Sequence, residues 1–128
     1  MNGPKILIVE DNPLNLELAT DLLQASGFRV RSTQTAEEGI RLAREVLPDL
    51  VLMDISLPGM DGLCATRILK ADAATRHLRV IGLTAHAMVG DEANGREAGF
   101  DGYLTKPIDT RTFVASIKEF IAANAGKA

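Results

Sequence analysis

Ile6-Leu7-Ile8-Val9 is followed directly by Glu10 and Asp11, and Leu50-Val51-Leu52-Met53 is followed by Asp54. Continuous apolar runs of this length are typical of strands buried on both faces of a parallel sheet. In such a sheet, chemistry gathers in the crevice outside the carboxyl ends of the strands, near the point where the strand order reverses. The carboxylates that close these two strands are therefore expected to converge in space.

Short apolar runs alternate with stretches of helical spacing along the chain, which indicates βαβ units, an α/β fold and a mainly parallel sheet. The predicted strands are Lys5 to Val9, Phe28 to Ser32, Leu50 to Asp54, Val80 to Thr84 and Gly102 to Thr105. Cap and turn residues predict helices over Pro13 to Ser26, Ala36 to Val46, Gly62 to Ala71, Met88 to Gly99, and a carboxyl-terminal stretch capped by Asp109. The fourth of these helices has few apolar anchors and an interior Gly95, so we expect it to be the loosest.

The composition is that of a compact domain. The chain has 128 residues, of which 46% are apolar and 24% charged, and we expect a single domain over 1–128 with a core of about 4–123 and a frayed carboxyl-terminal tail. It has no apolar run long enough to span a bilayer and no secretory signal, so a cytoplasmic location without a membrane partner is expected. A net charge of -3 without a block of Lys or Arg disfavours nucleic acid as a partner. Cys64 has no second cysteine to pair with, and its helical position predicts a small buried hydrophobe.

Two further strand ends add a hydroxyl group at Thr84 and an ammonium group at Lys106. Three clustered carboxylates repel one another unless a cation enters, and oxygen ligands without Cys or His favour Mg²⁺ over zinc. Asp54 is then placed to act as a nucleophile toward a phosphoryl group, which Lys106 would neutralise and Thr84 would bond through its hydroxyl. The pattern predicts phosphoryl transfer, which depends mainly on positioning and electrostatics.

Glu10-Asp11, Asp54, Thr84 and Lys106-Pro107, in this order and at these intervals, resemble the receiver domain of two-component response regulators over nearly the whole chain. The loop Leu57 to Gly62 is similar to the one that follows the family's phosphorylated aspartate, and Tyr103 matches its switch aromatic. The resemblance implies a three-layer, doubly wound, flavodoxin-like (βα)5 sheet of strand order 2-1-3-4-5. Asn12, Asn15 and the short carboxyl tail look like DivK-type single-domain regulators and the receivers of hybrid kinases.

The same resemblance implies a phosphorylation-activated response regulator of a two-component phosphorelay, a signalling switch rather than an enzyme. Asp54 would accept phosphoryl from a histidine kinase or a histidine phosphotransfer protein, with Mg²⁺ held by Asp11, Asp54 and the backbone carbonyl of Ser56, and by Glu10 mainly through water. Thr84 and Tyr103 would couple phosphorylation to a face built by the fourth helix, the fifth strand and the fifth helix. A downstream protein, or a second copy of the chain in a phosphorylation-dependent homodimer, would bind that face. Lys106-Pro107 would be a cis peptide.

Other interpretations of the cluster stay open. A Mg²⁺-dependent phosphatase with an aspartyl phosphate intermediate would need a general acid two residues after Asp54, where Ser56 stands. A receiver-like binding module that has abandoned phosphorylation would not require the full set of site residues. A dinucleotide-binding fold is disfavoured because Glu10-Asp11-Asn12-Pro13 replaces a glycine-rich phosphate loop. The resemblance implies that Ser56 and His86 lie near the phosphoryl group, whereas a loop histidine such as His86 is more often solvent-facing. Leu14 is either a docking contact or a residue at the edge of the core.

Overall fold

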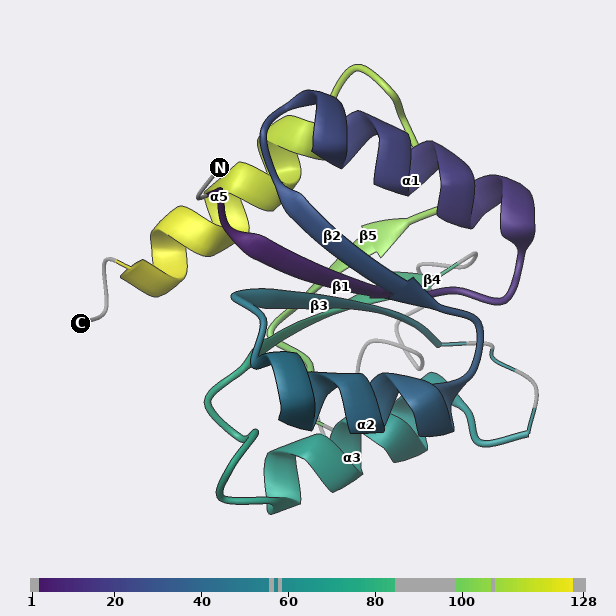
Figure 1. Cartoon of the computed structure of the whole chain (residues 1–128), viewed down its shortest axis with the longest axis vertical. Helices are drawn as coiled ribbons and strands as arrows, with labels where there is room; N and C mark the ends of the chain where they lie inside the picture. The colour runs from purple at the N-terminus through teal and green to yellow at the C-terminus, as the bar shows by residue number, and fades with distance from the viewer. Residues whose placement is uncertain (1–2, 56, 58, 85–98, 107, 126–128) are drawn as a thin grey trace.

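The computed structural model describes residues 3–55, 57, 59–84, 99–106 and 108–125 (Figure 1). Along the chain, these residues form β1 (Lys5–Val9), α1 (Pro13–Ala25), β2 (Arg29–Thr33), α2 (Ala36–Val46), β3 (Leu50–Asp54), α3 (Gly62–Ala71), β4 (Arg79–Thr84), β5 (Gly102–Thr105) and α5 (Phe113–Ala125). The strands form one parallel sheet of order β2-β1-β3-β4-β5, which confirms the predicted α/β fold class and strand order. The helix predicted from Met88 lies outside the described residues except for Gly99, which is its last.

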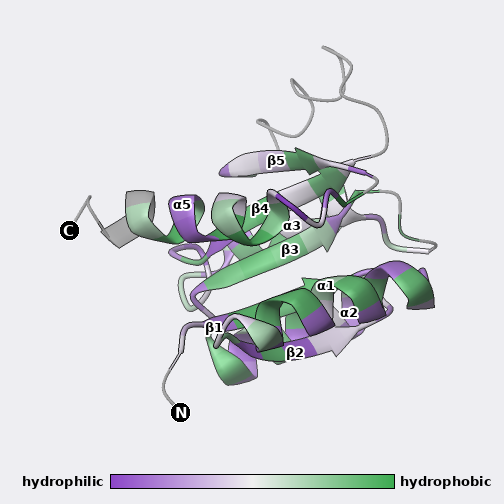
Figure 2. Cartoon of the chain, turned by 90° about the horizontal axis from the view of Figure 1, so that it is seen from above, coloured by the Kyte–Doolittle hydropathy of each residue, from purple (hydrophilic) through white to green (hydrophobic). Residues whose placement is uncertain are grey.

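Helices cover both faces of the sheet, so the molecule has three layers (Figure 1). Leu7, Val9, Val51 and Met53 point to the face covered by α2 and α3, where they join one apolar cluster. Their neighbours in the strands point to the face covered by α1 and α5 and join a second cluster. Because successive strand residues alternate between faces, the central strands must be apolar at every position. Figure 2 shows most of β3 in the hydrophobic colour, and all five of its residues, Asp54 included, are buried.

The edge strand β2 differs from the central strands. Its sequence Arg-Val-Arg-Ser-Thr leaves three of five residues exposed, because β2 has a neighbour on one side only. It begins at Arg29 rather than Phe28, and β4 begins one residue earlier than predicted, at Arg79. The continuous apolar pattern therefore identifies the central strands and not the edge.

Local side-chain chemistry accounts for the starts of the helices. Asn12 Oδ1 accepts hydrogen bonds from the amides of Leu14 (2.9 Å) and Asn15 (3.2 Å), as expected of a residue that caps α1 ahead of Pro13. Thr35 caps α2 through the amide of Glu38, although the Glu38 carboxylate pairs with Arg41 and does not complete the expected capping box. These caps set where each helix begins after the strand that precedes it.

Two predictions about side chains are wrong. Asp109 Oδ1 accepts from the amide of Arg111 (2.9 Å) and thereby caps a turn, and α5 begins only at Phe113. Cys64 is exposed, because α3 buries Gly62, Ala65, Thr66 and Leu69 on its inner face and turns Cys64 outward. Leu14 is 76% exposed, so burial at the edge of the core does not explain it.

Candidate functional site

The carboxylates that follow β1 and end β3 meet at the carboxyl edge of the sheet. These two strands are neighbours, and the strand order reverses between them, so their ends open into the same crevice. One carboxylate oxygen from each of Glu10, Asp11 and Asp54 lies within 4.8 Å of the others. Glu10 and Asp54 are buried, at 1% and 2% exposure, whereas Asp11 is exposed. The predicted convergence is therefore present, with two interior groups and one at the mouth.

Lys106 brings a cation to this cluster from the end of β5. Its backbone amide donates to the Thr84 carbonyl (2.8 Å), which extends the β4–β5 pairing by one residue and aims the side chain at the crevice. The Lys106 ammonium lies 2.7 Å from Asp54 Oδ2 and 2.9 Å from Glu10 Oε1. One ammonium group thus contacts both buried carboxylates.

Burial and crowding shift the pKa values of the groups at this site. Burial raises the pKa of Glu10 above its ordinary value, and the neighbouring Asp54 carboxylate adds to the shift, although the Asn12 amide and Lys106 oppose it. Burial acts to lower the pKa of Lys106, but its hydrogen bonds to Asp54 and Glu10 raise that pKa overall. The cluster therefore has less positive charge than its carboxylates would need when they are ionised.

The same residues fit a hard divalent cation. Three carboxylates against one ammonium leave two negative charges uncompensated when all are ionised. Glu10 Oε1 is buried, and apart from its ion pair with Lys106 it accepts no hydrogen bond from the described residues. A set of oxygen donors with unfilled acceptor capacity suits Mg²⁺, which keeps some of its waters while it binds one or two carboxylates.

Thr84 and Tyr103 lie on the neighbouring strand pair. Thr84 ends β4, is 7% exposed and pairs in register with Thr105 of β5. β4 also adjoins β3 in register, Asp54 opposite Leu83, so Thr84 follows directly beyond the residue opposite Asp54. Tyr103 is half-buried and packs against Phe100, with ring centroids 5.5 Å apart. The structure thus places Thr84 at the rim of the crevice and Tyr103 farther back along the sheet.

Residues 6–118 match the model of the response regulator receiver domain. The chain belongs to this family. It is also 47% identical over 116 residues to the polar-differentiation response regulator DivK of Brucella ovis, an alignment that covers 91% of this chain and 94% of the relative. The same identity and coverage hold for the protein of that name from Brucella anthropi. The chain is therefore a receiver domain of two-component signalling.

Solved receiver domains have the same fold. A receiver domain protein from Methanospirillum hungatei superimposes with a TM-score of 0.89 at 28% identity, over 99% of this chain and 100% of that one. The receiver domain of a sensor histidine kinase from Pseudomonas aeruginosa, with a magnesium ion coordinated in its active-site cleft, gives a TM-score of 0.86 at 36% identity, over 94% and 99% of the two chains. Within the described parts of this chain, no helix combines the length and hydropathy that a bilayer crossing needs.

Some predicted site residues lie outside the described residues: Ser56, His86 and Pro107.

The sequence did not reveal the role of Gly62 at the start of α3. A Cβ atom at Gly62 would lie 2.2 Å from the backbone oxygen of Asp54, so the chain passes directly against the residue that ends β3. A glycine eight residues past the end of a buried strand was the available signal. Gly62 therefore contributes to the position of Asp54.

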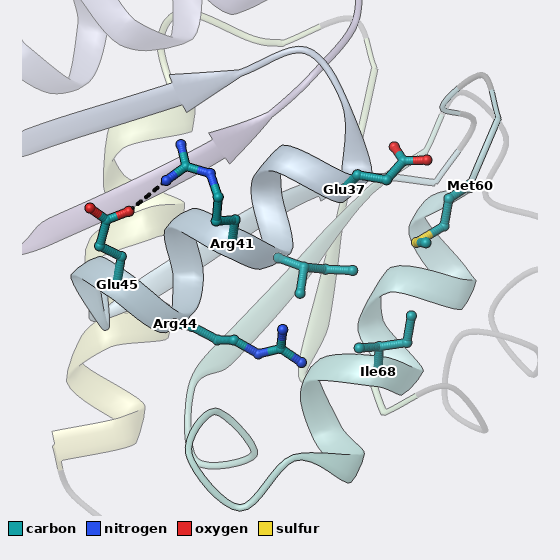
Figure 3. A pocket seen from close by; sticks show the side chains of 7 residues that line it. Glu37, Arg41, Arg44, Glu45, Met60 and Ile68 are labelled. Atoms are coloured by element: carbon teal, nitrogen blue, oxygen red, sulfur yellow. Dashed lines mark hydrogen bonds and ion pairs between the residues drawn. The ribbon is translucent and has the colours of Figure 1, made fainter.

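A pocket of about 520 Å³ lies between α2 and α3, away from the carboxylate cluster (Figure 3). Its walls carry balanced charge, with Arg41 paired to Glu45 at 2.8 Å. It is lined by Glu37, Ile40, Arg41, Arg44, Glu45, Met60 and Ile68. Because none of these belongs to the predicted site, the size of a hollow does not locate the chemistry in this receiver domain.

Proposed function

We propose that this receiver domain is the phosphorylation-activated switch of a phosphorelay, a single domain with a core of about 4–123. Asp54 accepts a phosphoryl group from a phosphohistidine of a histidine kinase or a histidine phosphotransfer protein. The observation that carries the proposal is the Lys106 ammonium, which lies within 2.9 Å of two buried carboxylates beside a third. This arrangement offers a nucleophile, a cation for the incoming charge and ligands for a metal, which phosphoryl transfer requires.

In the transfer, an oxygen of the Asp54 carboxylate bonds to phosphorus while the bond from phosphorus to the donor's imidazole nitrogen breaks. The imidazole leaves with the electron pair and takes a proton from solvent. Lys106, already 2.7 Å from Asp54 Oδ2, offsets the negative charge that arrives. Thr84 donates its hydroxyl to a phosphoryl oxygen. Later attack of water on the phosphorus releases inorganic phosphate and restores the carboxylate, and we propose no turnover of other substrates.

Mg²⁺ is the proposed cofactor. Asp11 and Asp54, with the backbone carbonyl of Ser56, would hold the ion directly, and Glu10 would hold it mainly through water. When bound, it supplies positive charge to the phosphoryl oxygens. The unused acceptor capacity of Glu10 Oε1 supports this assignment, as does the magnesium ion in the cleft of the Pseudomonas aeruginosa receiver domain.

Phosphorylation is proposed to reach partner proteins through Thr84 and Tyr103. These residues lie on adjacent strands, and β5 with α5 forms part of the proposed output surface, together with the fourth helix. A target protein or a second phosphorylated copy of the chain would bind there. A cis peptide between Lys106 and Pro107 is also part of the proposal.

A phosphorylation assay tests the proposal. Incubation with Mg²⁺ and acetyl phosphate labelled in its phosphoryl group should give one acid-labile phosphoryl group per chain. The label should be lost in Asp54→Ala and when a chelator removes Mg²⁺. Asp21→Asn removes an exposed carboxylate on α1, outside the cluster, and should be labelled like the wild type.

An unlabelled wild-type chain would contradict the proposal, as would label that survives in Asp54→Ala. A second measurement compares the proteins captured by phosphorylated wild type and by Asp54→Ala. Partners retained equally by both would indicate a binding module that does not use phosphorylation.

A further inference from the structure

Gly82 lies inside β4, where a glycine weakens a strand unless something needs the space. It pairs in register with Tyr103 of β5, and residues paired in this way point to the same face of a parallel sheet. A Cβ atom at Gly82 would lie 3.0 Å from Tyr103 Cδ1 and 3.1 Å from Phe100 Cε1. Both distances are tighter than those of ordinary contacts with a Cβ atom. Two aromatic rings therefore lie across the position that a side chain would occupy.

The two rings belong to the core on this side of the sheet. Phe100 is 8% exposed and joins the cluster that packs against α2 and α3, and Tyr103 packs on its margin. Their planes meet at 39°, a tilted arrangement that aromatic pairs favour. Because interiors are close-packed, the Tyr103 ring and a side chain at residue 82 cannot share this space. We call the position over Gly82, bounded by Phe100, the ring seat.

The ring seat lies beside the proposed phosphorylation site. Side chains alternate along a strand, so Gly82 and Thr84 point to the same face of β4. Thr84 is the residue whose hydroxyl is proposed to bond the phosphoryl group, and its backbone oxygen accepts from the Lys106 amide (2.8 Å). Gly82, beneath the Tyr103 ring, is thus the next position on this face of β4 to Thr84, which lies at the rim of the crevice.

We infer that Gly82 is the positioning residue for Tyr103: by carrying no side chain it provides the seat for the ring, and residue 82 thereby sets how Tyr103 is presented on the β5 surface. A Cβ atom at residue 82 requires the ring to shift by a few tenths of an ångström, and a larger side chain displaces it outward. The link from ring position to phosphorylation rests on the proposed function. The seat itself does not, since it is defined by packing alone.

The protein offers a direct measurement of the ring. Tyr103 is the chain's single tyrosine and there is no tryptophan, so intrinsic tyrosine fluorescence reports on Tyr103 alone. Quenching by acrylamide, without metal or phosphodonor, is compared among wild type, Gly82→Ala and Gly82→Val. The Stern–Volmer slope should increase from wild type to Ala to Val, roughly twofold in Val, because a ring that leaves a close-packed seat meets solvent.

Gly102→Ala is the matched control. Gly102 is also a strand glycine, in β5, but a Cβ atom there would meet Phe120 Cε1 at 2.6 Å on the opposite face of the sheet. This variant should lower the melting temperature without raising the quenching slope. A general loosening of the sheet, in contrast, would raise the slope in Gly102→Ala as well, and this result would overturn the inference.

A second arm adds Mg²⁺ and labelled acetyl phosphate. Gly82→Ala should take up label to within about twofold of the wild type, since the atoms nearest to a Cβ atom at residue 82 belong to Tyr103 and Phe100 and not to Asp54 or Lys106. The change in tyrosine fluorescence on labelling should be smaller in this variant than in the wild type. Unchanged quenching in folded Gly82→Ala and Gly82→Val would overturn the ring seat. If circular dichroism shows Gly82→Val unfolded, the slope of Gly82→Ala decides. A wild type that takes up no label counts against the proposed function and leaves the quenching result intact.

Discussion

Two lysines hold opposite ends of the sheet, and their surroundings differ in charge. Lys70 of α3 donates to Asp101 Oδ2 (3.0 Å), to the Leu78 carbonyl (2.8 Å) and to the Arg76 carbonyl (3.3 Å). Asp101 Oδ2 also accepts from the Val80 amide (2.8 Å), so the amino end of β4 is tied to α3 and to the segment before β5. Lys106, at the carboxyl end, contacts Asp54 and Glu10, whose carboxylates cluster with that of Asp11.

The two lysines thus differ as a structural cation and a cation of the proposed phosphorylation site. At Lys70, one ammonium meets one carboxylate and neutral carbonyls, and each acceptor has its donor. At Lys106, one ammonium serves a cluster with an excess of negative charge, which raises the pKa of Glu10 after burial has already done so. A cluster with equal positive and negative charge stabilises the fold without a ligand, whereas a cluster with excess negative charge favours the binding of a cation.

Each end also contains a glycine against which another group is packed, and this gives the largest expected effect. Gly62→Ala should lower the free energy of unfolding by about 3 kcal/mol, because the new Cβ atom would meet the rigid backbone oxygen of Asp54 at 2.2 Å. Gly99→Ala should cost about 1 to 2 kcal/mol, since its φ of +105° disfavours a side chain but the atom it meets is on the Lys70 side chain. Urea unfolding measures both. An equal loss in the two variants would contradict the assignment of Gly62 to the position of Asp54.

Replacing each lysine by methionine tests this difference in charge balance directly. At neutral pH without Mg²⁺, Lys106→Met should destabilise the protein by about 2 kcal/mol, because it leaves two buried carboxylates without a cation. Lys70→Met should cost about 1 kcal/mol through lost hydrogen bonds. Thermal melts with and without Mg²⁺ distinguish them: the ion should recover most of the loss in Lys106→Met and none in Lys70→Met. Recovery in both variants would show that Mg²⁺ acts elsewhere.

Glu10→Gln tests how the ionisation of Glu10 affects stability, and its effect should be smaller than that of Lys106→Met. The pKa of Glu10 in the folded protein is raised above its ordinary value of 4.5, so the folded state binds this proton more tightly than the unfolded state. Its contribution to stability is complete below pH 4.5 and is lost as pH rises through the folded pKa. In metal-free buffer, Glu10→Gln should therefore stabilise the protein at neutral pH, and the gain should disappear toward pH 4.5. A gain that persists in acid would show that ionisation of Glu10 is not its cause.

Thr66→Val has the smallest expected effect and is a control for the burial of a polar group by itself. It lies on the inner face of α3 at 0% exposure, and its hydroxyl has no hydrogen-bond partner within the described part of the chain. Thr66→Val should raise the free energy of unfolding by less than about 1 kcal/mol, because the variant removes a buried polar group without a partner. The change should be independent of pH and Mg²⁺. Calorimetry in the two buffers tests this, and a dependence on Mg²⁺ would place Thr66 within the reach of the cluster.

Much of the fold was predictable because the relevant signals are local. The apolar runs of β1 and β3 mark buried strands, and Asn12 and Thr35 mark helix starts through bonds to amides two or three residues away. The misses are residues whose surroundings come from distant parts of the chain. Cys64 faces outward because of how α3 packs on the sheet, and three of the five residues of β2 are exposed because this strand lies at the edge. Neither fact is contained in the few residues around each position.

By itself, the sequence determined the order of strands and helices and the placement of acidic residues at the ends of two buried strands, since periodicity and capping act over a few residues. Only the tertiary structure decided that Lys106 contacts both Glu10 and Asp54, that Gly62 abuts Asp54, and that Gly82 seats the Tyr103 ring. The physical reason is that these are contacts between different elements of the fold, which patterns within one element do not specify. Their distances and burial, and so their charge balance, exist only once the sheet has assembled.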